Sequence, residues 1–129
     1  MPTLQPQLPE HLSLETSYAV YRPTAEVTLA EAVEMIDRAI SYCRDNEIAG
    51  LLLDITALSG FGSPSVFDRF SFVRQWAETG AGHVAVSMVA PAAMIDSDKI
   101  GITIAMNRGL ESDVFTSESE AIEWLRERC

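Results

Sequence analysis

Basic residues are scarce in this sequence of 129 residues. Nine lysines and arginines stand against nineteen aspartates and glutamates, which gives a formal net charge of −10 at pH 7. A mean field of that sign repels the phosphates of nucleic acids and the anionic head groups of lipids. We therefore expect no nucleic-acid partner.

Cysteine and histidine are also few. Cys43 and Cys129 are the only cysteines, which is too few for a disulfide framework or a zinc site, and a reducing cytoplasm fits this usage best. The two histidines, His11 and His83, have no cysteine or carboxylate partner at a meaningful spacing. We expect no catalytic residues, no metal and no enzymatic activity, with a cryptic hydrolase as the third alternative for function.

A long uninterrupted apolar run is missing. The longest, HVAVSMVAPAAMI, contains Pro91 and is shorter than the roughly 20 residues that a membrane-spanning helix needs. The N-terminal MPTLQPQLPEH has three prolines and lacks the basic-then-apolar pattern of a signal peptide. We predict a loose arm over residues 1–11, a single domain over residues 12–129, and no membrane span.

Nucleotide and calcium motifs are incomplete. The segment GFGSPS lacks the lysine of a P-loop and the third glycine of a dinucleotide fingerprint. In MIDSDKI, Asp96 and Asp98 flank a serine, but the central glycine and the closing glutamate of a calcium loop are absent, so a solvated helix cap explains the pair better. We expect no cofactor.

Two helices are predicted from reciprocal caps and periodicity, and a further one without a reciprocal cap. Thr28 and Glu31 match a reciprocal cap before a run with apolar residues at three- and four-residue spacing, which predicts a helix over residues 28–44. Ser117 and Glu120 repeat this cap before the closing helix, in SESEAIEWLRER. The segment KIGITIAMNRG is predicted as a further helix despite Gly101 and its β-branched residues, which lower helix propensity.

The helix predicted over residues 64–79 has two alternative starts and too many apolar residues. Ser63 can cap it with Pro64 at the first position, and Ser65 with Asp68 offers a second cap two residues later. More residues are apolar than one buried stripe holds, namely Val66, Phe67, Phe70, Phe72, Val73, Trp76 and Ala77. At least one ring should face a partner or a ligand groove, and we select Phe72, which lies about 200° round the helix from Phe70.

Short β-branched or leucine-rich runs separate the helices. They are SYAVYR, IAGLLLDI, HVAVSMV and DVF, and LSLE precedes the first of them as a candidate antiparallel edge. Runs without polar alternation are typical of strands that are covered on both faces. The pattern predicts an α/β fold, a small mixed sheet of four to five strands with residues 51–55 and 84–89 central and helices packed on it.

Four segments carry a resemblance to a known family: the strand end LLLDITALSG with a helix opening just after it, the strand VAVSMV, and the terminal VFTSESEAIEWL. Together they resemble the SpoIIAA-like family, relatives of the STAS domains of sulfate transporters and anti-sigma-factor antagonists, over residues 12–127. The resemblance implies a STAS-like fold and a non-enzymatic regulatory or protein-interaction module. Some domains of this kind have been proposed to bind lipid-like molecules, so it implies a carrier or sensor of a small apolar ligand as the alternative.

The resemblance also draws attention to one serine. In the antagonist branch of STAS proteins, a partner kinase phosphorylates a serine at the start of the second helix, within Asp-Ser-Ser/Thr-Gly. Counting on from Asp54 places that position at Ser63. Its neighbours are Gly62, Pro64 and Ser65, so both the preceding acid and the following glycine of the motif are absent. Ser63 and Ser65 are therefore candidates for a helix cap or a phosphorylation switch, since a helix N-terminus accommodates a phosphate.

Large apolar side chains exceed what the buried stripes require. They either fill the core or form a self-association face or an apolar groove. Asp54 adds a carboxylate at the carboxyl end of a strand, where α/β sheets often contact ligands, although accepting hydrogen bonds from the following loop is its commoner role. The candidates that face a ligand or partner are Asp54, Phe61, Phe67, Phe72, Trp76 and Met94. The expected partner is a protein, with a homodimer favoured, and an apolar small molecule is the alternative.

Overall fold

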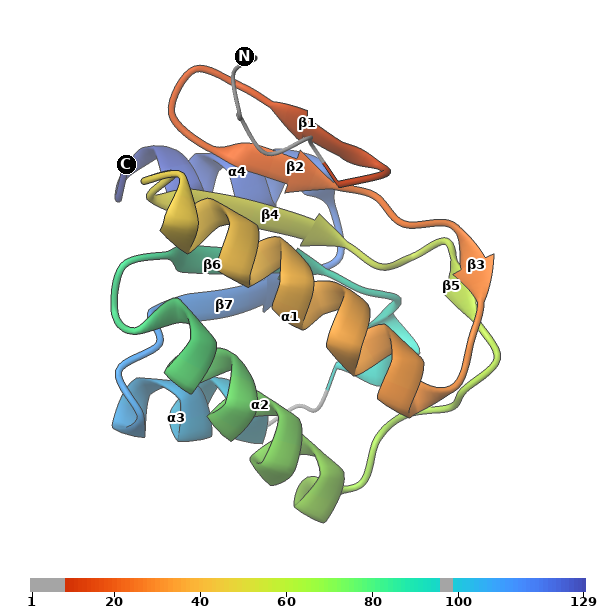
Figure 1. Cartoon of the computed structure of the whole chain (residues 1–129). Coiled ribbons are helices and arrows are strands. Elements are labelled where there is room, and N and C mark those ends of the chain that lie inside the picture. The colour runs from red at the N-terminus through yellow and green to blue at the C-terminus, as the bar shows by residue number, and fades with distance from the viewer. Residues whose placement is uncertain (1–8, 96–98) are drawn as a thin grey trace, which may run out of the picture.

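Five strands form one mixed sheet in the computed structural model, which describes residues 9–95 and 99–129 (Figure 1). In spatial order they are β1 (Leu12–Leu14), β2 (Ala19–Tyr21), β4 (Gly50–Asp54), β6 (Ala85–Val89) and β7 (Ser112–Phe115). β1 pairs with β2 in antiparallel register, and the other neighbours pair in parallel. The predicted α/β fold is confirmed, including the antiparallel edge and the central place of β4.

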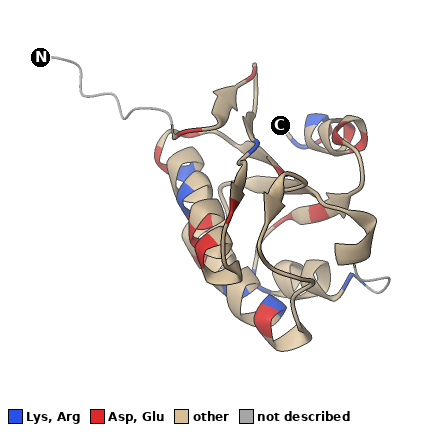
Figure 2. Ribbon diagram, turned by 90° about the vertical axis from the view of Figure 1, so that its right-hand side faces the viewer, with Lys and Arg blue, Asp and Glu red and all other residues tan. Residues whose placement is uncertain are grey.

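Four α-helices cover the two faces of the sheet. α1 (Leu29–Asp45), α2 (Val66–Gly80) and α3 (Ile100–Asn107) lie on one face, and α4 (Glu118–Arg126) lies on the other. Figure 2 shows α1 and α4 on opposite sides of the strands, with charged residues along both helices. Their positions confirm the three capped helices and the helix predicted in KIGITIAMNRG.

Three short elements were not predicted. β3 (Ala25–Glu26) and β5 (Leu58–Ser59) pair in parallel as a separate two-stranded ribbon, and η1 (Ala92–Met94) is a single 3₁₀ turn. Each is only two or three residues long, so a periodicity argument has too few positions to detect it.

Alternation along β4 divides the core into two clusters. Leu51 and Leu53 pack with residues of α1 and α2, whereas Leu52 packs with Ala121 and Leu125 of α4. All three leucines are fully buried. This double burial is the physical reason that the strand shows no polar alternation.

The caps of α1 and α4 form as predicted. The Glu31 backbone N–H donates to Thr28 Oγ1 over 3.1 Å, and the Thr28 N–H donates to Glu31 Oε1 over 2.9 Å. At α4, the Glu120 N–H donates to Ser117 Oγ over 3.3 Å. These bonds satisfy N–H groups that have no partner inside the helix.

The start of α2 corrects one of the two predicted alternatives. Ser65, and not Ser63, is the N-cap, since the Asp68 N–H donates to Ser65 Oγ over 3.0 Å and the Ser65 N–H donates to Asp68 Oδ2 over 3.4 Å. The reciprocal Ser-Asp pair satisfies two backbone donors, whereas a cap at Ser63 with Pro64 offers one hydroxyl and no returning carboxylate. The helix therefore begins at residue 66, two residues later than predicted.

The carboxyl end of α2 turns through two residues with positive φ. Ala81 adopts the left-handed conformation at φ 51°, followed by Gly82 at φ 79°. Glycine suits this conformation, and alanine adopts it only at a conformational cost. The helix ends at Gly80, immediately before this turn and one residue beyond the predicted range.

α2 packs chiefly against its neighbouring helices. Its main backbone contacts are with α1 and α3 rather than with the strands. Val73 and Trp76 still reach the core cluster that contains Leu51, Leu53 and Val86 of the sheet. The helix is thus connected to the sheet through its side chains, which leaves room between the helix layer and the strands.

The end of the predicted arm is anchored where it is described. The Leu12 N–H donates to Pro9 O over 3.1 Å, and the Arg22 N–H donates to His11 O over 3.0 Å. The cap expected from Asp96 and Asp98 lies outside the described residues. Among the helices that the structure describes, none has the length and apolar character to cross a bilayer.

Candidate functional site

An apolar cavity of about 130 Å³ lies between the sheet and the helices α1, α2 and α3. Side chains from all three helices line it, together with residues of β6, β7, η1 and the segment between β4 and α2. Within the part of the chain that the structure describes, the polar side chains of the lining are those of Arg69, Lys99, Ser112 and Asp113. The cavity follows from the position of α2, because that helix packs on α1 and α3 and does not fill the space above the strands.

Four of the six candidates that were predicted to face a ligand or partner line this cavity. They are Phe61, Phe72, Trp76 and Met94, which come from the segment before α2, from α2 itself and from η1. Phe67 and Asp54 do not line it. The predicted candidates thus fall into two groups, four residues that line the cavity and two that lie outside it.

The aromatic wall of the cavity is fixed by packing and one hydrogen bond. The rings of Phe72 and Trp76 lie 4.6 Å apart between centroids with their planes tilted by 36°. Trp76 Nε1 donates to Val33 O of α1 over 3.1 Å, so the buried indole N–H is satisfied. Phe72, which was selected as the ring facing a partner or a groove, lies on this interior side and is half-buried.

Arg69 brings a positive charge to the lining. Its Nε donates to Pro64 O over 3.1 Å, and its Nη2 donates to Ser63 Oγ over 3.0 Å and to Met94 O over 3.2 Å. These bonds join the start of α2 to the segment before it and to η1. Three contacts to neutral oxygens hold the guanidinium in a defined place.

Lys99 is the second cation of the lining, and it is paired. Its Nζ donates to Asp113 Oδ1 of β7 over 2.9 Å and to Val114 O over 3.3 Å. It also lies 5.7 Å from the centre of the Phe115 ring. Lys99 occupies the N-cap position of α3 in the left-handed conformation, at φ 47°, and its side chain makes no capping hydrogen bond to the helix. Asp113 thus balances the charge of Lys99.

The two candidate serines have different surroundings. Ser65 is used as the cap of α2, with its hydroxyl accepting from the Asp68 N–H. Ser63 is exposed, and its hydroxyl accepts from Arg69 Nη2. Only Ser63 therefore combines an accessible hydroxyl with a neighbouring cation.

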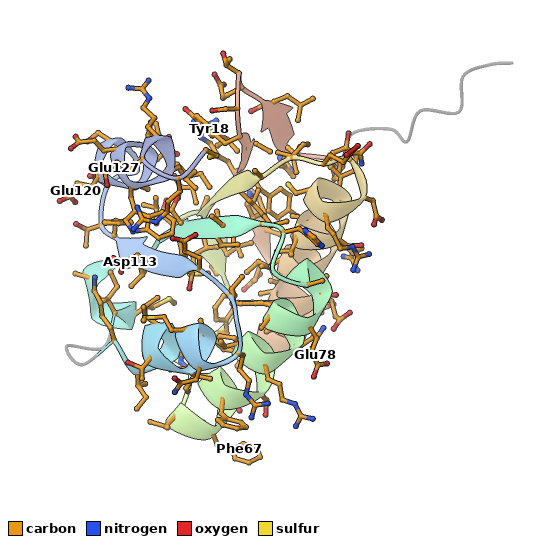
Figure 3. All side chains as sticks on the ribbon, turned by 90° about the vertical axis from the view of Figure 1, so that its left-hand side faces the viewer. Tyr18, Phe67, Glu78, Asp113, Glu120 and Glu127 are labelled. Carbon is orange, nitrogen blue, oxygen red and sulfur yellow. The ribbon has the colours of Figure 1, made fainter. Side chains whose placement is uncertain are left out.

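The opposite side of α2 carries exposed apolar side chains. Val66 is 59% exposed, Phe67 78% and Phe70 41%, and Met106 of the adjacent α3 is 67% exposed. We call these four residues the outer apolar face. Figure 3 shows Phe67 at the end of α2 and pointing away from the sheet. The Arg108 guanidinium lies 5.3 Å from the centre of the Phe70 ring.

Asp54 belongs to a polar cluster at the carboxyl end of β4. Its Oδ1 accepts from the Thr56 N–H over 3.0 Å and from Thr56 Oγ1 over 2.6 Å, which is the loop contact considered as its commoner role. Nearby, Arg22 donates from Nε and Nη2 to the two carboxylate oxygens of Glu118, each over 2.8 Å. Chiefly because of these hydrogen bonds, the pKa of Glu118 falls to about 2.

Metal binding and thiol chemistry find little support in the described part of the chain. Within residues 9–95 and 99–129, no three His, Cys, Asp or Glu side chains form a group that could hold a metal ion. Cys43 is fully buried in the core, and burial raises the pKa of its thiol to about 12. A thiol with that pKa stays protonated and is a poor nucleophile at neutral pH.

Sequence reasoning missed Arg69, Lys99 and the Arg22–Glu118 pair. A signal for Arg69 was present, because positions 69, 72, 73 and 76 follow the three- and four-residue spacing of one helix face. A charged residue on an otherwise apolar helix face indicates that its side chain has polar partners in the folded protein. Lys99 pairs with a residue 14 positions away, and Arg22 pairs with Glu118, 96 positions away. No local sequence pattern indicates either pair.

Comparison with known proteins identifies the fold. No family model matches the sequence, and no curated protein matches it significantly. An uncharacterised protein of the DUF3478 family from Shewanella loihica PV-4, described as having a SpoIIAA-like fold, is 17% identical, with 88% of this chain and 91% of that chain covered and a TM-score of 0.52. The unphosphorylated anti-sigma factor antagonist SpoIIAA is 20% identical over 89% of this chain and 96% of its own, with a TM-score of 0.48. The chain has a SpoIIAA-like fold, as the sequence resemblance implied.

Proposed function

We propose that this chain is a non-enzymatic regulatory module that binds another protein molecule through the outer apolar face of α2 and α3. The observation that carries the proposal is the exposure of Phe67 and Phe70 on one side of α2. Residues three positions apart are neighbours on a helix, so the two rings form one continuous surface. Exposed aromatic groups of this kind are favoured at the centres of protein interfaces.

The surroundings of the outer apolar face suit a second copy of the chain as the partner. Its edge carries both signs of charge, with Arg74 and Arg108 as cations and Asp68 and Glu78 as anions. A rim of mixed sign allows two identical molecules to approach although each has a net charge of −10. A homodimer is therefore the first assembly to test.

Sedimentation velocity at increasing protein concentration tests self-association. The wild type should form dimers at micromolar concentration, and the Phe67→Glu, Phe70→Glu double variant should stay monomeric because two carboxylates in an apolar contact oppose burial. The control is Thr24→Glu with Thr116→Glu, which adds the same charge at exposed positions outside α2 and α3. A wild type that is monomeric throughout, or a control that dissociates like the double variant, argues against a homodimer.

A second function is favoured by the cavity, namely the binding of a small apolar ligand. Its volume of about 130 Å³ is close to that of an engineered protein cavity of about 150 Å³ that takes up benzene. Drug-sized ligands occupy pockets of about 300–1,000 Å³, so the cavity as it stands suits a ring or a short chain rather than a complete lipid. The cavity volume therefore restricts the lipid-like ligands that the family resemblance implied to small ones.

A hydrolase has the least support among the three functions. The described neighbour of the Ser63 hydroxyl is Arg69, a permanent cation that cannot accept a proton as a general base. No feature of the described residues favours this function over the two binding functions.

A further inference from the structure

The described charges that line the cavity differ in their net sign from the chain as a whole. Among residues 9–95 and 99–129, the lining contains two basic residues, Arg69 and Lys99, and one acidic residue, Asp113. Because Asp113 is bonded to Lys99, that pair is close to neutral. Among the described residues of the lining, the excess charge is therefore positive, and it comes from Arg69.

The hydrogen bonds that hold Arg69 use only part of its guanidinium group. The bonds to Pro64 O, Ser63 Oγ and Met94 O use Nε and Nη2 and leave the Nη1 group outside these contacts. None of the ion pairs among residues 9–95 and 99–129 includes Arg69. A guanidinium held by neutral oxygens keeps its full charge for a further anionic group, and its planar donors suit a carboxylate.

The apolar part of the cavity lies beside this cation. Phe72 is three positions from Arg69 and Val73 is four positions away, so all three side chains project from the same side of α2. Met94, whose carbonyl accepts from Arg69, also lines the cavity. A ligand that enters the apolar space has the Arg69 guanidinium within the same lining.

We infer that the cavity binds a small amphiphilic carboxylate, with a ring or short hydrocarbon chain against Phe72, Trp76 and Met88 and its carboxylate on Arg69. The inference rests on the second function proposed above, that the cavity holds a ligand. The volume of about 130 Å³ sets the size of the apolar part, and Arg69 sets the charge of the polar end. A neutral molecule of the same shape can accept a hydrogen bond from Arg69 but forms no ion pair with it, and so binds more weakly.

Calorimetric titration with two probes tests the inference. Phenylacetate and phenylacetamide share the ring and differ in the charge of the polar end. We expect the wild type to bind phenylacetate about tenfold more tightly than phenylacetamide, since only the carboxylate adds an opposite charge to its hydrogen bond with the Arg69 guanidinium. Arg69→Met should remove this preference and leave the phenylacetamide affinity within about twofold, because the cavity walls are intact.

The matched control is Arg74→Met, on the same helix. Arg74 is exposed, pairs with Glu78 and does not line the cavity, so its loss changes the net charge equally without touching the site. This variant should keep the preference for phenylacetate. An equal loss of preference in Arg69→Met and Arg74→Met would mean that the overall charge, and not Arg69, selects the anion, and would overturn the inference.

The outcomes separate this inference from the function on which it rests. If phenylacetamide binds as tightly as phenylacetate, the cavity is a ligand site without a preference for carboxylates, and only the inference is lost. If neither probe binds, both are lost. Should Arg69→Met fail to fold, the Arg69 Nε–H NMR signal of the wild type decides: phenylacetate must shift it more than phenylacetamide does, and equal shifts contradict the inference.

Discussion

Ser63 and Ser65 are two residues apart and have different roles. Ser65 caps α2 and exchanges hydrogen bonds with Asp68, whereas the Ser63 hydroxyl is exposed and accepts from Arg69. A phosphate on Ser63 would lie beside the guanidinium of Arg69 and close to the N-terminus of α2. Of the two candidates for a switch, we therefore propose Ser63, and we assign Ser65 a structural role.

Substitution of the two serines tests this division. Ser65→Ala removes the cap and should lower the free energy of unfolding by about 1 kcal/mol. Ser63→Ala removes an exposed hydroxyl and one of the three hydrogen bonds of Arg69, and should cost less than about 0.5 kcal/mol. Urea denaturation of both variants measures the difference, and a larger loss for Ser63→Ala than for Ser65→Ala would contradict the assignment.

At the scale of elements, α2 presents different surfaces on its two sides. Phe72, Val73 and Trp76 point toward the cavity and the core, and Phe67 and Phe70 point outward. The sequence predicted that one helix face cannot bury all of these residues, and in the structure Phe67 and Phe70 are indeed exposed. It did not show which ring is outermost, because that depends on how α2 is rotated against α1 and α3.

A second feature at this scale is the pair that joins the end of β2 to the start of α4. Arg22 holds both carboxylate oxygens of Glu118, and these hydrogen bonds, with a smaller contribution from a hydrogen bond to Asp54, lower the pKa of that carboxyl from 4.5 to about 2. Between these pH values the folded state binds fewer protons than the unfolded state, so the pair stabilises the fold above pH 4.5 and this contribution is lost as the pH falls toward 2. Because the Arg22 side chain is 52% exposed, we expect a contribution below about 1 kcal/mol.

Glu118→Gln tests this linkage. The variant should be less stable than the wild type at pH 7, and the difference should shrink as the pH is lowered from 5 to 2 because the wild type loses the pair there. Glu120→Gln is the control, since Glu120 lies in the same first turn of α4 but accepts from Ser117 instead of an arginine. Thermal unfolding across this pH range provides the measurement, and a difference that does not change with pH would refute the linkage.

At the scale of the whole molecule, the fold was more predictable than the site. The elements follow from local signals such as the Thr28–Glu31 cap and the run Leu51–Leu53, which is buried on both sides. The cavity depends on the distance between α2 and the sheet, which no local pattern encodes. Arg69 and Lys99 acquire their roles only when η1, α3 and β7 are brought beside α2.

The two binding features share one helix. The outer apolar face and the cavity wall both include residues of α2, so a partner on the one and a ligand in the other would contact the same helix. The extent of the domain, with residues 1–11 as an arm and 12–129 as one unit, stays a prediction. The central claim is that the outer apolar face binds another protein molecule.

Photo-crosslinking in the cells that make this protein tests the central claim most directly. A photoreactive phenylalanine analogue replaces Phe67 in one variant and the exposed Thr24 in the other. Position 67 should trap one defined protein, either a second copy or a distinct partner, and adding Phe70→Glu should abolish the product, while position 24 should not trap it. The absence of a product at position 67, or the same products at both positions, would contradict the account.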